Sequence, residues 1–302
     1  MKYGFTLPGR GPLATPENMG TIARHGEELG YDCLLTGDHI LVPRDIASTY
    51  PYSENGAFPG SGTGESMEQL TVLSFLAGQT KTIRLGTSVM IVPHRNPLVA
   101  AKALATLDVL SQGRVILGVG VGWMREEFQA LGIPPFEERG AVTDEYIQAF
   151  KELWTSDNPS FQGQYCQFDN IDFLPKPVQK PHPPIWVGGE SRSALGRTAR
   201  LGDAWCPLGN NPQFPMGEPE QLAAGMERLA RYARREGRDP ADIEVVYRIG
   251  VTEEPDRVAG DIRRYAEMGI SQLIVGFGRQ ANSLDEMLSG MDDFARRVWP
   301  LV

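Results

Sequence analysis

Short apolar runs alternate with longer amphipathic stretches from one end of the chain to the other. This alternation is typical of repeated βα units, in which helices cover a parallel sheet. Eight runs have the character of strands: residues 3–7, 33–36, 83–91, 115–119, 185–187, 204–206, 243–249 and 273–275. A length of 302 residues fits one large barrel or two ordinary domains. Because eight units close a barrel and no break in composition divides the chain, we expect an α/β fold, a (β/α)8 TIM barrel, as a single domain over residues 1–302.

The intervening stretches carry helix punctuation. Thr15 is a candidate N-cap followed by Pro16, and Asn96 with Pro97 repeats that start. Apolar residues then recur at helical spacing, as in the stretch 222–233. The simplest explanation of these stripes is packing against a sheet.

Three segments exceed a minimal βα repeat: 44–66, 155–184 and 207–218. The middle one contains FQGQYCQF and then a proline-rich run, a pattern that predicts a small hairpin and an extended linker. All three follow the C-terminal ends of predicted strands. In a barrel the loops at that end build the active site, and long ones are commonly lids. The insertions therefore favour an enzyme over a passive scaffold.

The charge composition indicates which classes of binding partner to expect. The chain has 29 Lys and Arg against 38 Asp and Glu, a formal net charge of -9, and its basic residues are dispersed. Nucleic-acid and anionic membrane partners are therefore not expected, and a small-molecule substrate is. The N-terminus enters a strand-like run without a long apolar segment, so we expect a cytoplasmic protein.

The stretch CLLTGDHILVP places Asp38 and His39 at the end of the second predicted strand. A histidine there would lie at the catalytic end of a barrel, where imidazole can hydrogen-bond or protonate a substrate near neutral pH. The alternative is structural: the ring bonds a loop carbonyl and Asp38 caps the next segment. The residues alone leave both interpretations open.

The sequence lacks the motifs of common metal sites, serine nucleophiles and disulfide frameworks. The four histidines form no HxH or HExxH, so no metal site is expected. The sequence contains no GxSxG nucleophile elbow. The cysteines are far apart and lack a CxxC pair, which indicates neither disulfides nor zinc. The residues concerned are His25, His39, His94, His182, Cys33, Cys166 and Cys206.

Two glycine-rich stretches could meet a ligand. LGVGVGW, residues 117–123, has GxGxG spacing instead of the dinucleotide-binding GxGxxG, and fits a strand exit where a planar ligand nears the backbone. Trp123 could stack on that ligand or plug the barrel mouth. In IWVGGESRSALGRTARLGD, a strand leads through Gly188 and Gly189 to a helix whose N-terminus suits phosphate, with Arg192 in its first turn. A glycine turn with a Ser191 cap explains the same letters without a ligand.

Taken together, TGDH, RLGTSVMIVPHRNPLVAAKALATLDVLSQGRVILGVGVGW and PPIWVGGES with ARLGDAW resemble the bacterial luciferase-like superfamily, within it the oxidoreductases that use the deazaflavin coenzyme F420. The resemblance covers nearly the whole chain and implies a luciferase-like (β/α)8 barrel, usually a homodimer. The coenzyme ring is expected at the strand C-termini and its phosphate near the last strands.

The resemblance also implies residue roles. It places His39 beside the coenzyme ring and the substrate as the catalytic residue, and Asp38 in contact with the coenzyme. It implies a non-proline cis peptide bond between Ser88 and Val89 that supports the ring. The full set of expected cofactor-binding residues is Asp38, Thr87, Ser88, Val89, Trp123, Val187, Gly188, Gly189, Glu190 and Ser191. Arg192 and Arg279 are further anion-binding candidates.

One position departs from the pattern. Where the sugar-phosphate dehydrogenases of this superfamily carry an acidic residue beyond the fourth strand, this chain has Trp123, and Glu126 and Glu127 are read as helix surface. A sugar-phosphate substrate is therefore less expected, and the general acid is left open.

Three functions follow from the resemblance. The first is hydride transfer between coenzyme F420 and a small organic substrate. The second is an FMN-dependent monooxygenase that uses reduced flavin and dioxygen. The third is a flavin-binding protein without turnover.

Overall fold

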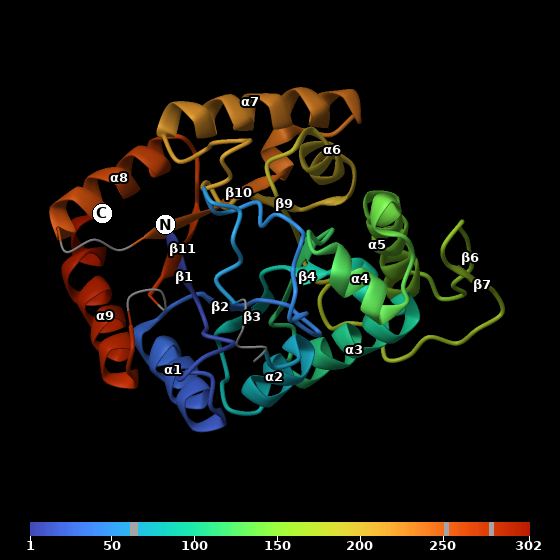
Figure 1. Ribbon diagram of the computed structural model, residues 1–302, viewed down its shortest axis with the longest axis horizontal. Helices are drawn as coiled ribbons and strands as arrows, with labels where there is room; N and C mark the ends of the chain where they lie inside the picture. Colours follow the sequence, from blue (N-terminus) through green and yellow to red (C-terminus); the bar gives the residue numbers. More distant parts are fainter. Residues whose placement is uncertain (61–65, 251–253, 278–280) are drawn as a thin grey trace.

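A ring of parallel strands closes on itself in the computed structural model, which describes residues 1–60, 66–250, 254–277 and 281–302. The strand order is β3-β2-β1-β11-β10-β9-β8-β5-β4, and the additional pairing of β3 with β5 closes the ring. β3 and β4 share the third position, so the barrel has the predicted eight positions. The predicted (β/α)8 fold is confirmed, and Figure 1 shows the helices around the ring.

The barrel strands lie within a residue or two of their predicted ranges. They are β1 (Lys2–Thr6), β2 (Cys33–Thr36), β3 (Arg84–Thr87), β4 (Met90–Ile91), β5 (Val115–Gly120), β8 (Ile185–Gly188), β9 (Ala204–Cys206), β10 (Glu244–Gly250) and β11 (Gln272–Gly276). The predicted strand 83–91 is divided, because the chain leaves regular pairing at Ser88 and Val89, whose peptide bond is cis. The cis bond implied by the resemblance is thus present.

The helices also follow their sequence signals. Thr15 caps α1 by accepting from the Asn18 N–H, and Asn96 caps α3 through the N–H groups of Leu98 and Val99. The helices are α1 (Pro16–Leu29), α2 (Gln69–Ala77), α3 (Pro97–Leu110), α4 (Arg125–Leu131), α5 (Arg139–Thr155), α6 (Arg192–Leu201), α7 (Pro219–Arg235), α8 (Pro255–Glu267) and α9 (Leu284–Arg297). The 3-10 turns are η1 (Val92–His94), η2 (Phe136–Glu138), η3 (Pro240–Asp242) and η4 (Trp299–Leu301).

The barrel interior is a packed layer of side chains. Its fully buried members are Cys33, Leu35, Ile116, Trp186, Ala204, Val246 and Ile274. Side chains two residues further along a strand point to the same face. Gly120, Gly188, Cys206 and Arg248 therefore follow the interior layer toward the C-terminal mouth.

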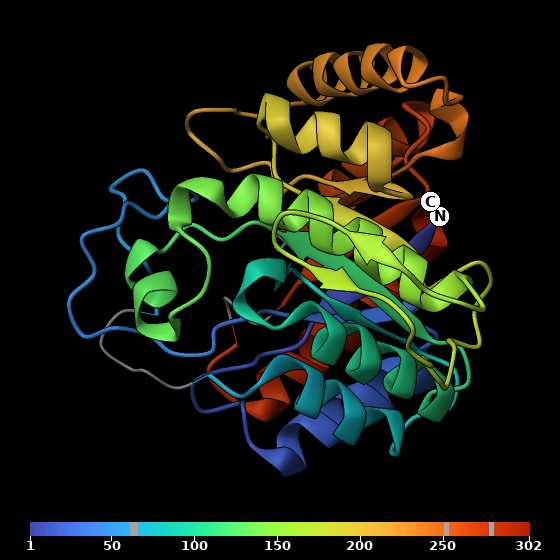
Figure 2. The same ribbon diagram turned by 90° about the vertical axis from the view of Figure 1, so that its right-hand side faces the viewer.

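The long segments predicted from the sequence lie in different parts of the barrel. Residues 37–60 lie across the ring in Figure 1, and Figure 2 shows them with α4 at one end of the barrel. The predicted hairpin is formed by β6 (Phe161–Gln162) and β7 (Gln167–Phe168), which pair antiparallel on the outside. Within the described ranges, no helix has the length and apolarity needed to cross a membrane.

Candidate active site

His39 lies at the C-terminal mouth, just after β2, and is paired with a carboxylate. Its Nδ1 is 3.0 Å from Oε2 of Glu127, the third residue of α4. The imidazole is partly exposed, whereas the Glu127 side chain is 1% exposed. A histidine that meets a buried carboxylate on one nitrogen and the barrel mouth on its other side fits the expected catalytic position.

Glu127 was missed by the sequence analysis, which read it as helix surface. Its Oε1 accepts from the backbone N–H of Ile40 at 2.8 Å and of Leu41 at 3.3 Å. Burial raises the pKa of Glu127, but the His39 hydrogen bond, the nearby imidazoles and the Ile40 N–H outweigh it and hold the pKa below its usual range. Glu127 is therefore an ionised carboxylate inside the protein.

Glu126 also binds the segment that follows β2. One carboxylate oxygen accepts from the N–H groups of Ala47 and Ser48, and the other from the Ser48 hydroxyl at 2.7 Å. The first turn of α4 thus fastens the segment that follows β2 at several points. Acidic residues in the first turn of a helix are ordinary on protein surfaces, so no local signal marked this pair of glutamates as loop-binding residues.

A second histidine lies behind this pair. The His94 Nδ1 is 3.7 Å from Oε1 of Glu127, too long for a hydrogen bond, and the side chain is 1% exposed. Neither ring nitrogen has a hydrogen-bond partner among the described residues. Burial lowers the pKa of His94 to about 4, despite the opposing charge of Glu127. His94 is therefore neutral at physiological pH.

Asp38 points away from the mouth. Its carboxylate is 0% exposed and binds Arg95 at two points, while Ile91 donates its N–H to Oδ2 at 2.9 Å. Arg95 also binds Glu68 at 2.7 Å. Both carboxylate oxygens of Asp38 are therefore occupied by the protein, an arrangement that differs from the coenzyme contact implied by the resemblance.

Aromatic side chains wall the mouth beside His39. The Trp123 ring lies 5.2 Å from Phe58 and 5.1 Å from Tyr50, between centroids, and 6.3 Å from the His39 ring. Phe58 lies 4.9 Å from His39. Trp123 thus packs on the segment after β2, in a T-shaped contact with Tyr50 and a tilted contact with Phe58. The wall combines residues from two βα loops and forms one apolar side of the mouth.

The GxGxG stretch serves protein packing. A Cβ at Gly118 would meet the carbonyl of Thr87, and one at Gly120 would meet Cγ2 of Val89. At Gly188 the added atom would lie 2.9 Å from Cγ1 of Val89. These contacts explain Gly118 and Gly120 without a ligand, and a planar ligand at this strand exit stays a prediction. The two glycines admit the backbone and side chain at the irregular third strand position.

Two other residues that were predicted to contact the cofactor, Thr87 and Val187, are buried in the protein interior. Thr87 is buried and donates its hydroxyl to the Gly118 carbonyl at 2.7 Å, and Val187 is 1% exposed. Ser88 accepts a hydrogen bond from Arg248 of β10 at 2.9 Å. The mouth thus has a polar floor at Ser88 and Arg248 beside the apolar wall. Arg248 is a second residue that the sequence analysis missed.

The Gly-Gly segment has an anion-binding shape. Gly189 has φ +103°, and Ser191 caps α6 by accepting from the Ala194 N–H at 3.1 Å. The N–H groups of Arg192 and Ser193 precede the first helical bond and have no hydrogen-bond acceptor in the described chain. Two open donors at a helix N-terminus favour a phosphate group.

Glu190 lies within this segment but turns inward. Its Oε1 accepts from the Leu208 N–H at 2.6 Å, and the side chain is buried. Burial raises the pKa of this carboxyl, although these hydrogen bonds oppose the rise. The side chain therefore holds the 207–218 segment in place, and only the backbone of Glu190 remains for a phosphate. Arg279 lies outside the described residues.

The 207–218 and 37–60 segments meet over the mouth. Asn210 donates its side-chain amide to the Tyr52 carbonyl at 3.1 Å. Burial raises the pKa of the Tyr52 hydroxyl, and the charge of Glu190 adds to the effect. Two loops predicted to cover the site are therefore in contact across it.

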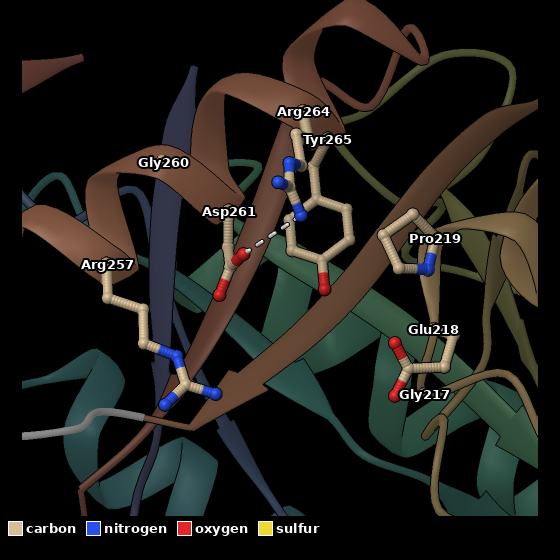
Figure 3. Close-up of a pocket in the computed structure, with 8 residues that line it drawn as sticks. All are labelled: Gly217, Glu218, Pro219, Arg257, Gly260, Asp261, Arg264 and Tyr265. Atoms are coloured by element: carbon tan, nitrogen blue, oxygen red, sulfur yellow. Dashed lines mark ion pairs between the residues drawn. The ribbon is translucent and has the colours of Figure 1, made fainter.

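A surface cavity of about 470 Å³ opens on the outside, between α8 and the start of α7 (Figure 3). Arg257, Arg264, Asp261 and Glu218 surround it, so its charges are mixed. A smaller cavity of about 190 Å³ shares Gly217, Asp261 and Tyr265 with it and reaches Arg248. The larger hollow is thus separate from the predicted site, although the smaller one borders its floor.

These features define a barrel enzyme with a histidine–carboxylate pair at the strand C-termini. The chain belongs to the family described as luciferase-like monooxygenase, whose model matches residues 1–259. Its matched relatives include an FMNH(2)-dependent monooxygenase, and solved structures with the same fold include an F420-dependent enzyme.

Three known proteins illustrate the range. The uncharacterized protein Rv0953c of Mycobacterium tuberculosis is 28% identical over 299 residues, 99% of each chain. An FMNH(2)-dependent dimethylsulfone monooxygenase of Pseudomonas putida is 36% identical over 177 residues, 58% of this chain and 48% of that protein. The structure of an F420-dependent secondary alcohol dehydrogenase has a TM-score of 0.78 at 19% identity, covering 100% and 98% of the two chains.

Proposed function

We propose that this protein is an oxidoreductase that transfers a hydride between coenzyme F420 and a small organic substrate. The observation that carries the proposal is the His39–Glu127 pair at the barrel mouth, 3.0 Å apart. Hydride transfer to or from a hydroxyl or carbonyl group is accompanied by a proton, and a partly exposed imidazole held by a carboxylate can take or give that proton.

The residues of the mouth fit the coenzyme. Backbone N–H groups at the start of α6 would hold its phosphate, and Gly189, with its positive φ, would let the chain turn close to it. Ser88 and Val89 would support the ring from below, and Trp123 would border it. When bound, F420 supplies a carbon centre that accepts or releases a hydride. In this proposal Asp38 holds Arg95 and does not touch the coenzyme.

The substrate would lie between the ring site and His39. The Asn210–Tyr52 contact joins the two covering segments above this space, and such covers exclude water from the reacting groups. The wall of Trp123, Phe58 and Tyr50 favours a substrate with an apolar part.

The second candidate is an FMN-dependent monooxygenase. It is favoured by the Pseudomonas putida relative, which is named for FMNH(2) and dimethylsulfone. A deazaflavin has carbon in place of the nitrogen that supports oxygen activation, so the cofactor decides the reaction class. A flavin-binding protein without turnover is the third possibility, and activity assays separate it from the other two.

The deciding experiment is a fluorescence titration of the purified apoprotein with F420 and with FMN. The proposal expects tight binding of F420, and tight binding of FMN alone would replace it with the monooxygenase. His39→Ala should then lower turnover about 100-fold while retaining cofactor binding. His25→Gln, on α1 beside Asp292, is the matched control. Unchanged turnover in His39→Ala would remove its catalytic role.

We further propose a homodimer in which α2 and α3 of two copies meet. Phe75, Val99 and Leu110 are 42%, 66% and 62% exposed on these two helices, which pack against each other. Lys102 and Asp108 are the charged residues of the two helices, and Asp108 is buried. A nearly uncharged, apolar face suits a second copy, because two chains of net charge -9 repel each other least where they meet through such a face. Light scattering should give a molecular mass twice that of one chain for the wild-type protein. Val99→Asp should give the mass of one chain.

A further inference from the structure

We propose that Glu127 is a positioning residue that fixes His39 in the tautomer with its proton on Nδ1, leaving Nε2 as a hydrogen-bond acceptor at the barrel mouth. The assignment of the tautomer is independent of the cofactor. Its consequence for the substrate rests on the function proposed above.

The donors around Glu127 determine where the proton lies. Oε1 accepts from two backbone N–H groups, those of Ile40 and Leu41, and Oε2 faces Nδ1 of His39 at 3.0 Å. A backbone N–H only donates a hydrogen bond, so a proton on Oε1 would face two donors and find no acceptor. An ionised carboxylate only accepts, and the hydrogen of the Oε2 contact must therefore belong to Nδ1.

The neighbouring charged groups do not compete for Glu127. His94, the other imidazole near it, is buried and neutral, and its Nδ1 is 3.7 Å away. The charge of Asp38 is matched by Arg95, which also binds Glu68. Glu127 therefore makes its only imidazole hydrogen bond among the described residues to Nδ1 of His39, which orients that ring.

The opposite edge of the His39 ring faces the mouth. Phe58 and Trp123 lie beside the ring, at 4.9 and 6.3 Å between centroids. Within the described ranges Nε2 makes no hydrogen bond to the protein. An acceptor at this point favours a substrate that presents a hydrogen-bond donor, such as a hydroxyl group, beside the reacting carbon.

The test is nitrogen NMR of the apoprotein with labelled histidine, with the His39 signals assigned by their loss in His39→Ala. The chemical shifts of the two ring nitrogens distinguish a protonated from an unprotonated nitrogen. At neutral pH we expect protonated Nδ1 and unprotonated Nε2 in the wild-type protein. A wild-type His39 with its proton on Nε2 overturns the proposal, whatever the variants do.

Glu127→Gln should reverse the tautomer. The glutamine oxygen can still accept from Ile40 and Leu41, but its NH₂ group must donate to Nδ1, which moves the ring proton to Nε2. Glu126→Gln is the matched control, because Glu126 binds Ala47 and Ser48 and does not touch His39. An unchanged tautomer in folded Glu127→Gln, or an equal change in Glu126→Gln, contradicts the proposal.

A kinetic comparison then separates positioning from stability. If F420 is the cofactor, Glu127→Gln should lower kcat about 100-fold with little change in KM and should alter the pH profile. Glu145→Gln should retain both, because Glu145 accepts from backbone N–H groups of the β6–β7 hairpin, outside the mouth. Failure to bind F420 would overturn the proposed function but leave the NMR result standing. Normal turnover with a reversed tautomer would overturn the positioning role of Glu127 alone.

Discussion

Arg95 holds the carboxylate of Asp38 at two points, with Nη1 2.6 Å from Oδ2 and Nη2 2.8 Å from Oδ1. This pair joins the end of β2 to the chain that leaves η1, directly below the mouth. Two parallel hydrogen bonds between a guanidinium and a carboxylate are stronger and more directional than a single contact. The pair therefore holds the segment that carries His39 in a fixed position.

Asp38→Asn should destabilise the fold. The variant leaves Arg95 with Glu68 as its remaining carboxylate partner, and breaking a buried ion pair typically costs about 3 to 5 kcal/mol in the free energy of unfolding. Urea unfolding measures this loss, while cofactor affinity of the folded protein should change less than threefold. Glu68→Gln, which removes the more exposed partner of Arg95, should cost less than about 1 kcal/mol. A large loss of cofactor affinity with unchanged stability would instead restore Asp38 as a coenzyme contact.

Gly120→Ala should disturb the mouth through Val89. The added methyl group would run into Cγ2 of Val89, a stiff branched side chain, so the third strand position must shift. Overpacking of this kind costs about 1 to 3 kcal/mol. Gly260→Ala on α8 is the control, because its methyl group meets nothing within 4 Å and alanine favours a helix. Thermal unfolding of both variants checks this, and equal melting temperatures would show that the space at Gly120 is not needed.

His94 should make stability depend on pH. Its pKa falls from 6.5 to about 4 on folding, so between these values the unfolded chain binds more protons than the folded one. The free energy of unfolding should therefore decrease as the pH falls from about 6.5 to about 4, by up to about 3 kcal/mol from this group. Glu127 and Asp38 oppose the shift and Arg95 and His39 add to it, which makes the comparison with a variant necessary.

His94→Phe isolates this contribution. The ring of His94 already packs on Phe128 at 5.0 Å, so a phenyl ring suits the site and carries no titrating group. Urea unfolding of both proteins between pH 7 and 4 should show a flatter pH dependence for the variant. Parallel curves for the two proteins would mean that His94 titrates alike in both states.

The barrel could be predicted because strand and helix periods are local. Runs such as 33–36 and 204–206 coincide with β2 and β9, and the caps at Thr15 and Asn96 act as expected. The divided third strand is the exception, since strand-like residues stand on both sides of Ser88 and no local signal marks the break. Its cis bond was implied by the family resemblance and not by periodicity.

The site was predicted less completely, because its contacts join segments that are far apart in sequence. His39 and the Gly-Gly turn could be placed at strand ends, and both lie there. The partner of His39 is 88 residues away, and Ser88 meets Arg248 over a separation of 160. Nothing local distinguishes Glu127 from a surface glutamate, or shows that Gly118 and Gly120 face protein atoms. Only the closed barrel brings these residues together.

Trp123 should report cofactor binding by its fluorescence. Its ring lies at the mouth beside His39 and Phe58, so a bound planar ring in the proposed position would quench it. In a tryptophan-fluorescence titration with F420 or FMN, Trp123→Phe should lose most of the quenching and bind about tenfold more weakly. Trp299→Phe is the control, because Trp299 stacks on Tyr3 near the C-terminus and away from the mouth. Full quenching in Trp123→Phe and its loss in Trp299→Phe would place the bound ring elsewhere, and would move the proposed cofactor site off the aromatic wall.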